Sequence, residues 1–281
     1  MRIHHYASVT EILATAAQPF TRPANTDARS NYLTSKRGAD WWGVSNCDEV
    51  KNVVAAGWPD GAVLVDDAFD SVAEKIPPAI SFRRKLRRSN QGDEFDIHHA
   101  LQGNLSRAWT SRRRQPNLGS GIVRIVVDVC GNSGTGSDEL KWRGVAALAL
   151  SRTMASAGYS VEIVAAAASA GSVRTSRTDC IAVVVKARHE RPSTPQLAAL
   201  TCLSGVFRSY IFAAWTAAAD AEGVDVISGL GQAVELESTY PADPRIATVV
   251  TSAKIKDRDS ALAWILQSHT LLQQSTIQAE K

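Results

Sequence analysis

One continuous apolar segment constrains the fold of this chain more than any other feature. Ile122–Val129 is dense in β-branched residues and is bounded by glycines at positions 119, 121 and 131. An apolar run of this length between turn residues predicts a fully buried β-strand. A Gly/Ser/Thr-rich loop follows, and from about Asp138 to Ala157 apolar residues recur at helical spacing. The order of strand, polar loop and helix predicts an α/β domain.

Further segments extend this pattern along the chain. Strands are expected at residues 159–165, 180–187 and 246–253, with a short one at 224–227. Helices are expected at residues 260–274 and at 194–219, the latter broken near Gly205. Apolar strands that alternate with helices predict a mainly parallel or mixed sheet with helices on both faces.

The N-terminal residues predict a small, mainly helical unit with an aromatic core of its own, formed by Trp41, Trp42 and Trp58. Polar residues 19–40 are expected to be a loop or an extended arm. Helices are expected at residues 9–17, 45–56 and 60–75. The predicted organisation is a helical unit at 1–80, a basic connecting segment at 81–120 and the α/β domain at 121–281.

The connecting segment carries a concentrated positive charge. Residues 81–115 contain nine basic and three acidic residues, an excess of six positive charges in a chain whose net charge is +3. Such a cluster predicts a surface that binds polyanions. We expect Trp109 to stack on bases and the basic side chains to contact phosphates. The basic candidates are Arg83, Arg84, Lys85, Arg87, Arg88, Arg112, Arg113 and Arg114.

Two other interpretations of this basic segment remain open. An acidic protein partner would be equally compatible with the charges. Alternatively, the segment is a solvated linker whose cations form salt bridges with Asp93, Glu94 and Asp96. The sequence does not decide between a nucleic acid, an acidic protein surface and a linker.

The polar loop after the first strand comes within one residue of a phosphate-binding P-loop. Its sequence, from Gly131 to Ser137, has the form G-x-x-x-x-G-S and lacks the lysine that contacts the terminal phosphates. A glycine loop at a helix N-terminus can still bind an anion, and the candidate residues are Gly131, Gly134, Gly136 and Ser137. The competing interpretation is an ordinary turn between a strand and a helix.

Asp128-Val-Cys130-Gly-Asn132 resembles the D-x-S-x-S metal-site motif of von Willebrand factor A-like domains. The segment 157–164 is also similar to the second strand of that family. The resemblance implies a von Willebrand factor A-like or Rossmann-like fold over about residues 121–275, and a divalent cation such as Mg²⁺. Cys130 and Asn132 stand at the two serine positions, and a thiol is a poor ligand for Mg²⁺. We therefore expect a degenerate site, with Asp128 and Asn132 as the remaining oxygen ligands and no required cofactor.

Four stretches also resemble an uncharacterised group of phage-encoded proteins. They are Trp41–Gly43, Ala56–Gly61, Gly92–His98 with Arg107–Trp109 after it, and the domain around Asp128. This resemblance implies a viral origin and a place in the cytoplasm of the host cell or with the virus particle. It implies no particular chemistry.

The remaining residues of chemical interest predict no further site. Cys47, Cys130, Cys180 and Cys202 show neither a disulfide framework nor a zinc-binding spacing. Neighbouring residues on a helix point in different directions, so His98-His99 would rarely bind one ion together. No apolar run approaches the roughly 18 residues of a membrane span, and no local motif of a catalytic nucleophile is present. We expect an intracellular protein without a membrane partner.

These patterns predict a non-enzymatic binding or assembly protein. Its α/β domain would contact a protein, and its Arg-rich segment would contact nucleic acid or an acidic surface. Further copies of the chain are among the candidate partners. One alternative is an enzyme that uses a nucleotide or phosphate ester at loop 131–137. A second is a structural component of a virus particle, in which residues 19–40 become ordered on a neighbouring subunit.

Overall fold

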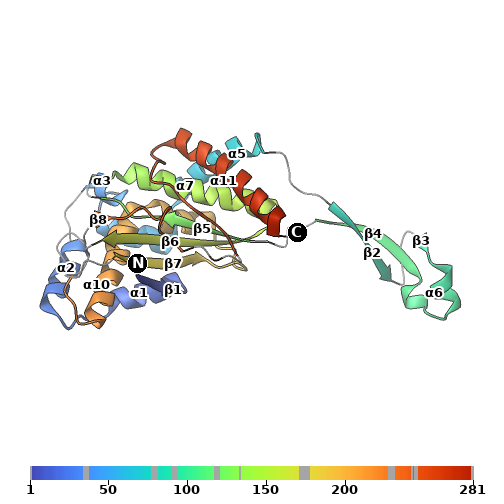
Figure 1. The fold of residues 1–281 in the computed structure, drawn as a ribbon, viewed down its shortest axis with the longest axis horizontal. Helices are drawn as coiled ribbons and strands as arrows, with labels where there is room; N and C mark the ends of the chain where they lie inside the picture. Colours follow the sequence, from blue (N-terminus) through green and yellow to red (C-terminus); the bar gives the residue numbers. More distant parts are fainter. Residues whose placement is uncertain are drawn as a thin grey trace.

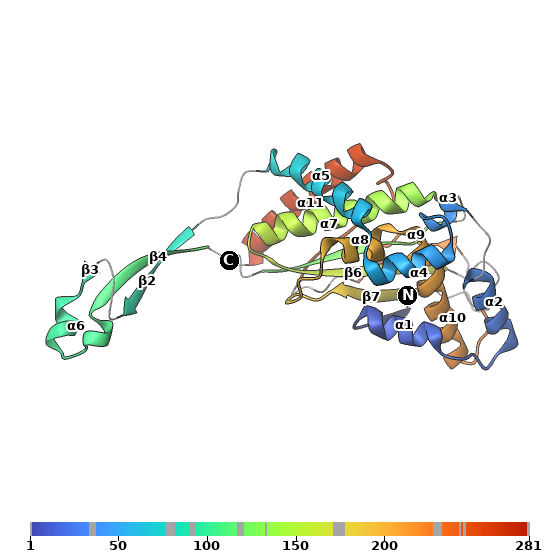
Figure 2. The same cartoon turned by 180° about the vertical axis from the view of Figure 1, so that it is seen from behind.

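The computed structural model describes most of the chain and divides it into two regions (Figures 1 and 2). The first is an α/β body, and the second is a small antiparallel sheet that projects away from it. We call the projecting region, residues 82–89 and 94–116, the hairpin. The described residues are 2–33, 38–76, 82–89, 94–116, 121–132, 134–170, 178–226, 232–241, 243 and 246–279.

The body is built on a mixed sheet of six strands. The order is β1-β7-β6-β5-β9, with β8 paired to β6. Strands β1 and β7, β5 and β6, and β5 and β9 run parallel, whereas β6 is antiparallel to both β7 and β8. The predicted α/β class with a mixed sheet is therefore confirmed. The bounds are β1 (Arg2–Tyr6), β5 (Ile122–Asp128), β6 (Ser160–Ala170), β7 (Thr178–Lys186), β8 (Gln232–Ala233) and β9 (Ala247–Val250).

Strand β5 lies between β6 and β9 in this sheet and has apolar residues on both faces. Val123, Ile125 and Val127 belong to the main hydrophobic cluster, which also contains residues of several helices. Val126 belongs to a second cluster on the opposite face, where Leu236 is fully buried. Burial on both faces explains why this strand is apolar at nearly every position.

Three helices lie together on one side of the sheet in Figure 1: α5 (Pro59–Ala73), α7 (Ser137–Ser156) and α11 (Arg258–Ala279). Helix α7 also packs against α8 (Thr194–Cys202), and Gly144 lies at the contact between the two helices. A Cβ at Gly144 would lie 2.6 Å from the carbonyl carbon of Thr201, which is closer than real Cβ contacts. The absence of a side chain at this position therefore lets the two helices approach.

The N-terminal residues are part of the body rather than a separate unit. Strand β1 pairs with β7, and Ile12 and Val65 lie in the same hydrophobic cluster as Val123. This finding corrects the division expected at residue 80. The apolar helix faces were recognised in the sequence, but the sequence does not show which element each face covers. The N-terminal helices are α1 (Val9–Ala17), α2 (Pro23–Leu33), α3 (Ala39–Trp42), α4 (Cys47–Ala56) and α5.

Helix α2 replaces most of the loop or extended arm expected at residues 19–40. It is attached to Asp220, about 200 residues later in the chain. The Asp220 carboxylate accepts hydrogen bonds from Thr21 N at 2.8 Å and Asn25 Nδ2 at 3.1 Å. Asn25 is fully buried, and its Oδ1 accepts a hydrogen bond from Val226 N. Polar residues that suggested a loop are therefore used in tertiary hydrogen bonds.

A broken helix follows α8. The chain continues through α9 (Ser204–Val206), a π-helical turn η2 (Phe207–Ile211) and α10 (Phe212–Ala221), so the break expected near residue 205 is present at Leu203. No single described helix is long and apolar enough to cross a membrane. The pair 194–202 and 204–221 passes that test only when combined across a 62° bend.

The hairpin occupies the region expected to be a connecting segment. It contains β2 (Phe82–Ser89), β3 (Glu94–Phe95) and β4 (Trp109–Pro116) in the order β2-β4-β3. Helix α6 (Ile97–Leu101) and a short 3₁₀ turn η1 (Leu105–Arg107) lie between β3 and β4 in the chain. Gly103 lies between them with a φ of 76°, a left-handed conformation that does not continue a helix.

Candidate functional sites

Asp128 ends β5 and is surrounded by internal hydrogen-bond donors. Its carboxylate accepts hydrogen bonds from the backbone N–H of Cys130, at 3.0 Å, and from that of Leu236. Arg143 of α7 is also buried, stabilises the carboxylate charge and donates to the Cys130 carbonyl oxygen at 2.8 Å. Burial raises the pKa of Asp128 to about 6, although Arg143 and the two N–H groups act in the opposite direction.

This donor set does not fit Mg²⁺. The Oδ1 of Asn132 accepts a hydrogen bond from Ala233 N at 3.1 Å, and the Cys130 thiol donates to the Ala168 carbonyl at 3.3 Å. Burial also raises the pKa of Cys130 far above its ordinary value, so the thiol stays protonated. Among the described residues, no three His, Cys, Asp or Glu side chains are grouped as metal ligands. Arg143 supplies the positive charge beside Asp128 that a cation would otherwise supply.

The glycine loop is placed before α7 as expected, but its electrostatics do not favour a phosphate. Gly136 is the N-cap, and the first turn contains Asp138 and Glu139. These carboxylates already complement the positive end of the helix dipole and would repel an anion. A Cβ on Gly131 would collide with Thr135, whereas Gly134 and Gly136 have open space around them. Ser137 begins the helix, and position 133 lies outside the described residues.

Arg208 on the π-helical turn joins this loop to the N-terminal part of the chain. Its side chain is buried, and it donates to the carbonyl oxygens of Trp41 at 2.6 Å and Thr135 at 2.7 Å. The Ser204 hydroxyl donates to the same Trp41 oxygen at 2.8 Å. Sequence reasoning missed Arg208, and its only local signal is a single cation within an apolar helical segment.

The basic candidates lie on two paired strands of the hairpin. Strand β2 is antiparallel to β4, and the register sets Arg84 opposite Arg114 and Lys85 opposite Arg113. The two strands contain eight basic and no acidic residues. The side chains of β2, and those of β4 beyond Trp109, lie outside the described part of the structure. The backbone register alone thus brings both clusters, separated by more than 20 residues in the sequence, into one ribbon.

Trp109 lies at the start of β4 and packs against Phe95. The ring centroids are 5.0 Å apart and the planes meet at 60°, an edge-to-face arrangement. Trp109 is half-buried, while Phe95 is 51% exposed. The more accessible aromatic ring at this end of the ribbon is therefore Phe95, which the sequence analysis did not select.

Comparison with known proteins assigns the chain to a family. Residues 1–271 match the family model described as Domain of unknown function (DUF7192). The chain belongs to the DUF7192 family. No curated protein and no solved structure matches it. The DUF7192 match covers the body and the hairpin together, so both regions belong to the family architecture.

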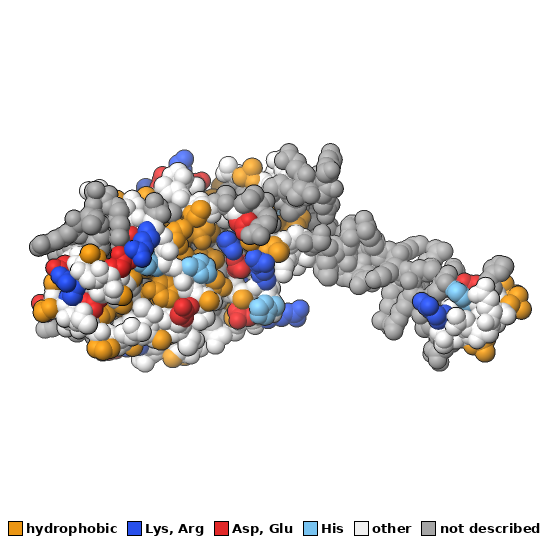
Figure 3. Space-filling view, turned by 60° about the horizontal axis from the view of Figure 1, so that its bottom comes forward, with side chains coloured by type: hydrophobic (Ala, Val, Ile, Leu, Met, Phe, Trp, Pro, Cys, Tyr) orange, Lys and Arg blue, Asp and Glu red, His pale blue; other side chains and the backbone are white. Residues whose placement is uncertain are grey.

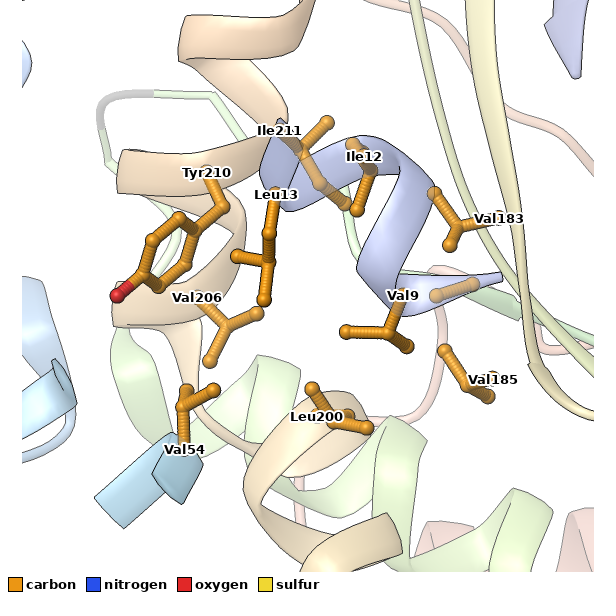
Figure 4. A pocket seen from close by; sticks show the side chains of 11 residues that line it. Val9, Ile12, Leu13, Val54, Val183, Val185, Leu200, Val206, Tyr210 and Ile211 are labelled. Atoms are coloured by element: carbon orange, nitrogen blue, oxygen red, sulfur yellow. The ribbon is translucent and has the colours of Figure 1, made fainter. Parts of the chain in front are cut away.

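The DUF7192 body also contains an apolar pocket that sequence analysis missed. Figure 4 shows Val9, Leu13, Leu200 and Val206 pointing toward a common space, while the Tyr210 hydroxyl points away from it. About 340 Å³ is not filled by atoms, counted with the open mouth. Residues from α1, α4, β6, β7, α8, α9 and η2 line it, so no local motif could identify it. The π-helical turn contributes to this pocket, and such turns are frequent at functional sites.

Proposed function

We propose that this protein is a non-enzymatic nucleic-acid-binding and assembly protein. In this proposal the basic ribbon of the hairpin, β2 and β4, contacts the phosphates. The body contacts a protein partner. The observation that carries the proposal is the antiparallel register of β2 and β4, which places the two Arg-rich clusters side by side.

The geometry of the ribbon suits a polyanion. Each strand has eight residues, which corresponds to about 26 Å at the usual rise per residue. A two-stranded ribbon is narrow enough to enter the major groove of B-DNA or to follow a phosphate backbone. The hairpin projects from the body in both views, so the body does not cover it from both sides (Figures 1 and 2).

The backbone register of the ribbon pairs basic residues with one another. Like charges directly opposite each other destabilise an antiparallel pair, and Arg84 faces Arg114 across the ladder. A bound polyanion would neutralise these charges and release counterions. Binding of a polyanion therefore explains these paired basic residues better than a purely structural role does. The solvated-linker interpretation gives no reason for the register.

The environment of Asp128 supports the non-enzymatic part of the proposal. Asp128 is 3% exposed, and its carboxylate accepts hydrogen bonds from the backbone N–H groups of Cys130 and Leu236. The acidic first turn of α7 weighs against the alternative in which loop 131–137 binds a nucleotide. No observation favours that enzyme over a binding protein.

We also propose the finer assignments made by resemblance. The succession of β5, polar loop, α7 and β6 is the succession that a von Willebrand factor A-like domain implies. The phage origin, with a place in the host cytoplasm or the virus particle, is supported by the resemblance of Trp41–Gly43 and Gly92–His98. For the virus-particle alternative, the projecting element would be the hairpin rather than residues 19–40.

The test is binding of labelled single- and double-stranded DNA and RNA between about 50 and 300 mM salt. The Arg112/Arg113/Arg114→Ala variant removes three charges from β4. We expect the wild-type protein to bind, and the log–log salt slope to be shallower in the variant by about 2–3 if each residue neutralises one phosphate.

The matched control removes three exposed basic residues from the body, with the Lys75/Arg191/Lys254→Ala variant. Its net charge equals that of the β4 variant, and we expect its salt slope to stay near the wild-type value. No binding by the wild-type protein at the lowest salt would refute the proposal. An equal loss of slope in both variants would show that overall charge, rather than the ribbon, attracts the nucleic acid.

A further inference from the structure

The far end of the hairpin exposes large apolar side chains to solvent. Phe95, Ile97, Leu101 and Leu105 are 51%, 58%, 80% and 64% exposed, and we call these four residues the hairpin tip. They are four of the six large exposed hydrophobic residues in the described part of the chain. Figure 3 shows hydrophobic side chains at this end of the molecule. Apolar groups gathered at one exposed end mark an interaction surface.

Backbone hydrogen bonds hold the loop that carries the hairpin tip. Asp96 N donates to the Ala108 carbonyl oxygen at 2.6 Å, which closes the loop across its base. Asn104 N donates to the His99 carbonyl oxygen at 2.9 Å and ties the residues after α6 back to that helix. Leu101 lies between these two bonds in the chain. The hairpin therefore presents its most exposed apolar side chain on a closed loop.

The described surface of this loop is compatible with a phosphate backbone beside it. Within residues 95–109, the exposed residues that accompany the hairpin tip are Gln102, Gly103, Asn104, Ser106 and Arg107. Arg107 carries the only charge among them. Asp96 is half-buried and accepts a hydrogen bond from His99 N at 3.3 Å. Asp93 and the side chain of Glu94 lie outside the described residues.

The hairpin tip is continuous with the basic ribbon. Phe95 pairs with Trp109 across β3 and β4, and β4 continues from Trp109 to Arg112 and its basic neighbours. Three residues of an extended strand span about 10 Å, which corresponds to about three base-pair steps of B-DNA. A ribbon that binds phosphates would therefore bring the tip close to the bases a few steps away.

The residue types of the tip favour a duplex over a single strand. The apolar part of a nucleic acid is its stack of bases. Proteins that bind single strands stack successive bases on aromatic rings, whereas Leu, Ile and Phe side chains act as wedges between the stacked base pairs of a duplex. Three of the four tip residues are aliphatic, and the one exposed ring, Phe95, packs edge-to-face against Trp109.

We propose that the hairpin tip inserts between base pairs of double-stranded DNA and bends the duplex, with Leu101 as the leading side chain. This inference rests on the proposed function and deepens it, because the ribbon holds the phosphates and the tip selects a duplex that unstacks easily. Apolar wedges kink DNA by about 20–90°. Flexible pyrimidine–purine steps and mismatched pairs lower the cost of unstacking, so they are the favoured sites.

The experiment uses a duplex of about 30 base pairs with a dye at each end and 2-aminopurine at a central TA step. Energy transfer between the dyes reports bending, and the fluorescence of 2-aminopurine rises when its base is unstacked. We expect saturating wild-type protein to increase both signals. We also expect it to bind a duplex with one central mismatch about tenfold more tightly than the perfect duplex.

The Leu101/Leu105→Ser variant removes the two most exposed apolar side chains and leaves β2 and β4 unchanged. We expect it to bind without either fluorescence change and to prefer the mismatch by less than about twofold. Its salt slope should equal that of wild type, which would show that the ribbon is intact. Leu271→Ser, at a 55% exposed leucine of α11, is the matched control and should bend DNA like wild type.

The outcomes separate this inference from the proposed function. Wild-type protein that binds with a steep salt slope but leaves the duplex straight and stacked would overturn the wedge and retain the ribbon. A Leu101/Leu105→Ser variant that bends DNA like wild type would also overturn it. An unbent duplex, together with sedimentation on vesicles of phosphatidylcholine that the variant loses, would assign the tip to a membrane. No binding at the lowest salt would refute the ribbon and the wedge together.

Discussion

The guanidinium of Arg208 lies 4.0 Å from the centroid of the Trp41 ring and donates a 2.6 Å hydrogen bond to the Trp41 carbonyl oxygen. The same guanidinium reaches the Thr135 carbonyl in the loop after β5. One buried cation thus connects the N-terminal helices, the π-helical turn and the polar loop. The forked, planar guanidinium of Arg208 suits this position, because its two terminal nitrogens donate to two carbonyl oxygens that lie in different directions.

Replacing Arg208 by lysine is expected to lower the free energy of unfolding by about 2–4 kcal/mol, because lysine cannot bond both carbonyls and stack on the ring. Urea denaturation measures the difference. Arg191→Lys, at an exposed position, should change stability by less than about 0.5 kcal/mol. Equal midpoints for wild type and Arg208→Lys would show that the connection contributes nothing to stability.

The buried carboxylate of Asp128 predicts a pH dependence of stability. Its pKa is about 6 in the folded protein, above the ordinary value of 3.8. Between about pH 4 and pH 6 the native state binds more protons here than the unfolded chain, so this contribution to stability falls as pH rises. The loss is complete above about pH 7 and amounts to about 3 kcal/mol at most.

The Asp128→Asn variant removes this titration and keeps an oxygen that accepts hydrogen bonds. Wild type loses this contribution as pH rises and the variant does not. We therefore expect the free energy of unfolding of the variant, minus that of wild type, to increase from about pH 4 to pH 7. Urea denaturation at a series of pH values gives the difference. A constant difference across this range would mean that the pKa of Asp128 is not raised.

The contact between α7 and α8 predicts intolerance of a side chain at Gly144. A Cβ there would lie 2.6 Å from the Thr201 carbonyl carbon and 2.7 Å from the Cys202 sulfur. We expect Gly144→Ala to destabilise the protein by about 1–3 kcal/mol through overpacking, despite the better helix propensity of alanine. Gly134→Ala has open space and should be nearly neutral. A neutral Gly144→Ala in thermal denaturation would contradict the close approach.

The four cysteines are expected to be inert in the folded protein. All are buried and free, and burial raises the pKa of Cys180 and Cys202 to about 12. Since the thiolate is the reactive form, alkylation followed by mass spectrometry should give little labelling in buffer and four labels in denaturant. Rapid labelling of Cys130 in the native protein would instead identify a reactive thiol beside Asp128.

The body is expected to fold without the hairpin. Among the described residues, the hydrophobic clusters of the body contain no hairpin residue. Replacing residues 79–118 by a flexible linker of about twelve residues should shift the melting temperature by only a few degrees. The shortened protein should lose nucleic-acid binding. A shortened protein that is unfolded would show that the hairpin supports the body.

Local patterns were sufficient for several elements. Ile122–Val129 predicted β5 because burial on both faces requires apolar residues at successive positions. Residues 9–17 and 194–219 were predicted to be helical, and the structure has α1 and α8 at the start of these two segments. The two Arg-rich clusters were evident from composition alone. Each of these properties depends on neighbours in the sequence, and sequence reasoning can evaluate it.

Only the tertiary structure decided which distant segments meet. Strand β1 pairs with β7, about 175 residues away, and Asn25 of α2 bonds to Asp220. The pairing of β2 with β4 brings two basic clusters into one ribbon. Arg143 lies beside Asp128, where the resemblance to von Willebrand factor A-like domains implied a divalent cation and the sequence predicted a degenerate site. Backbone pairing and buried charge compensation depend on groups brought together by the whole fold. A sequence states which groups are present, but long-range packing determines which of them become partners.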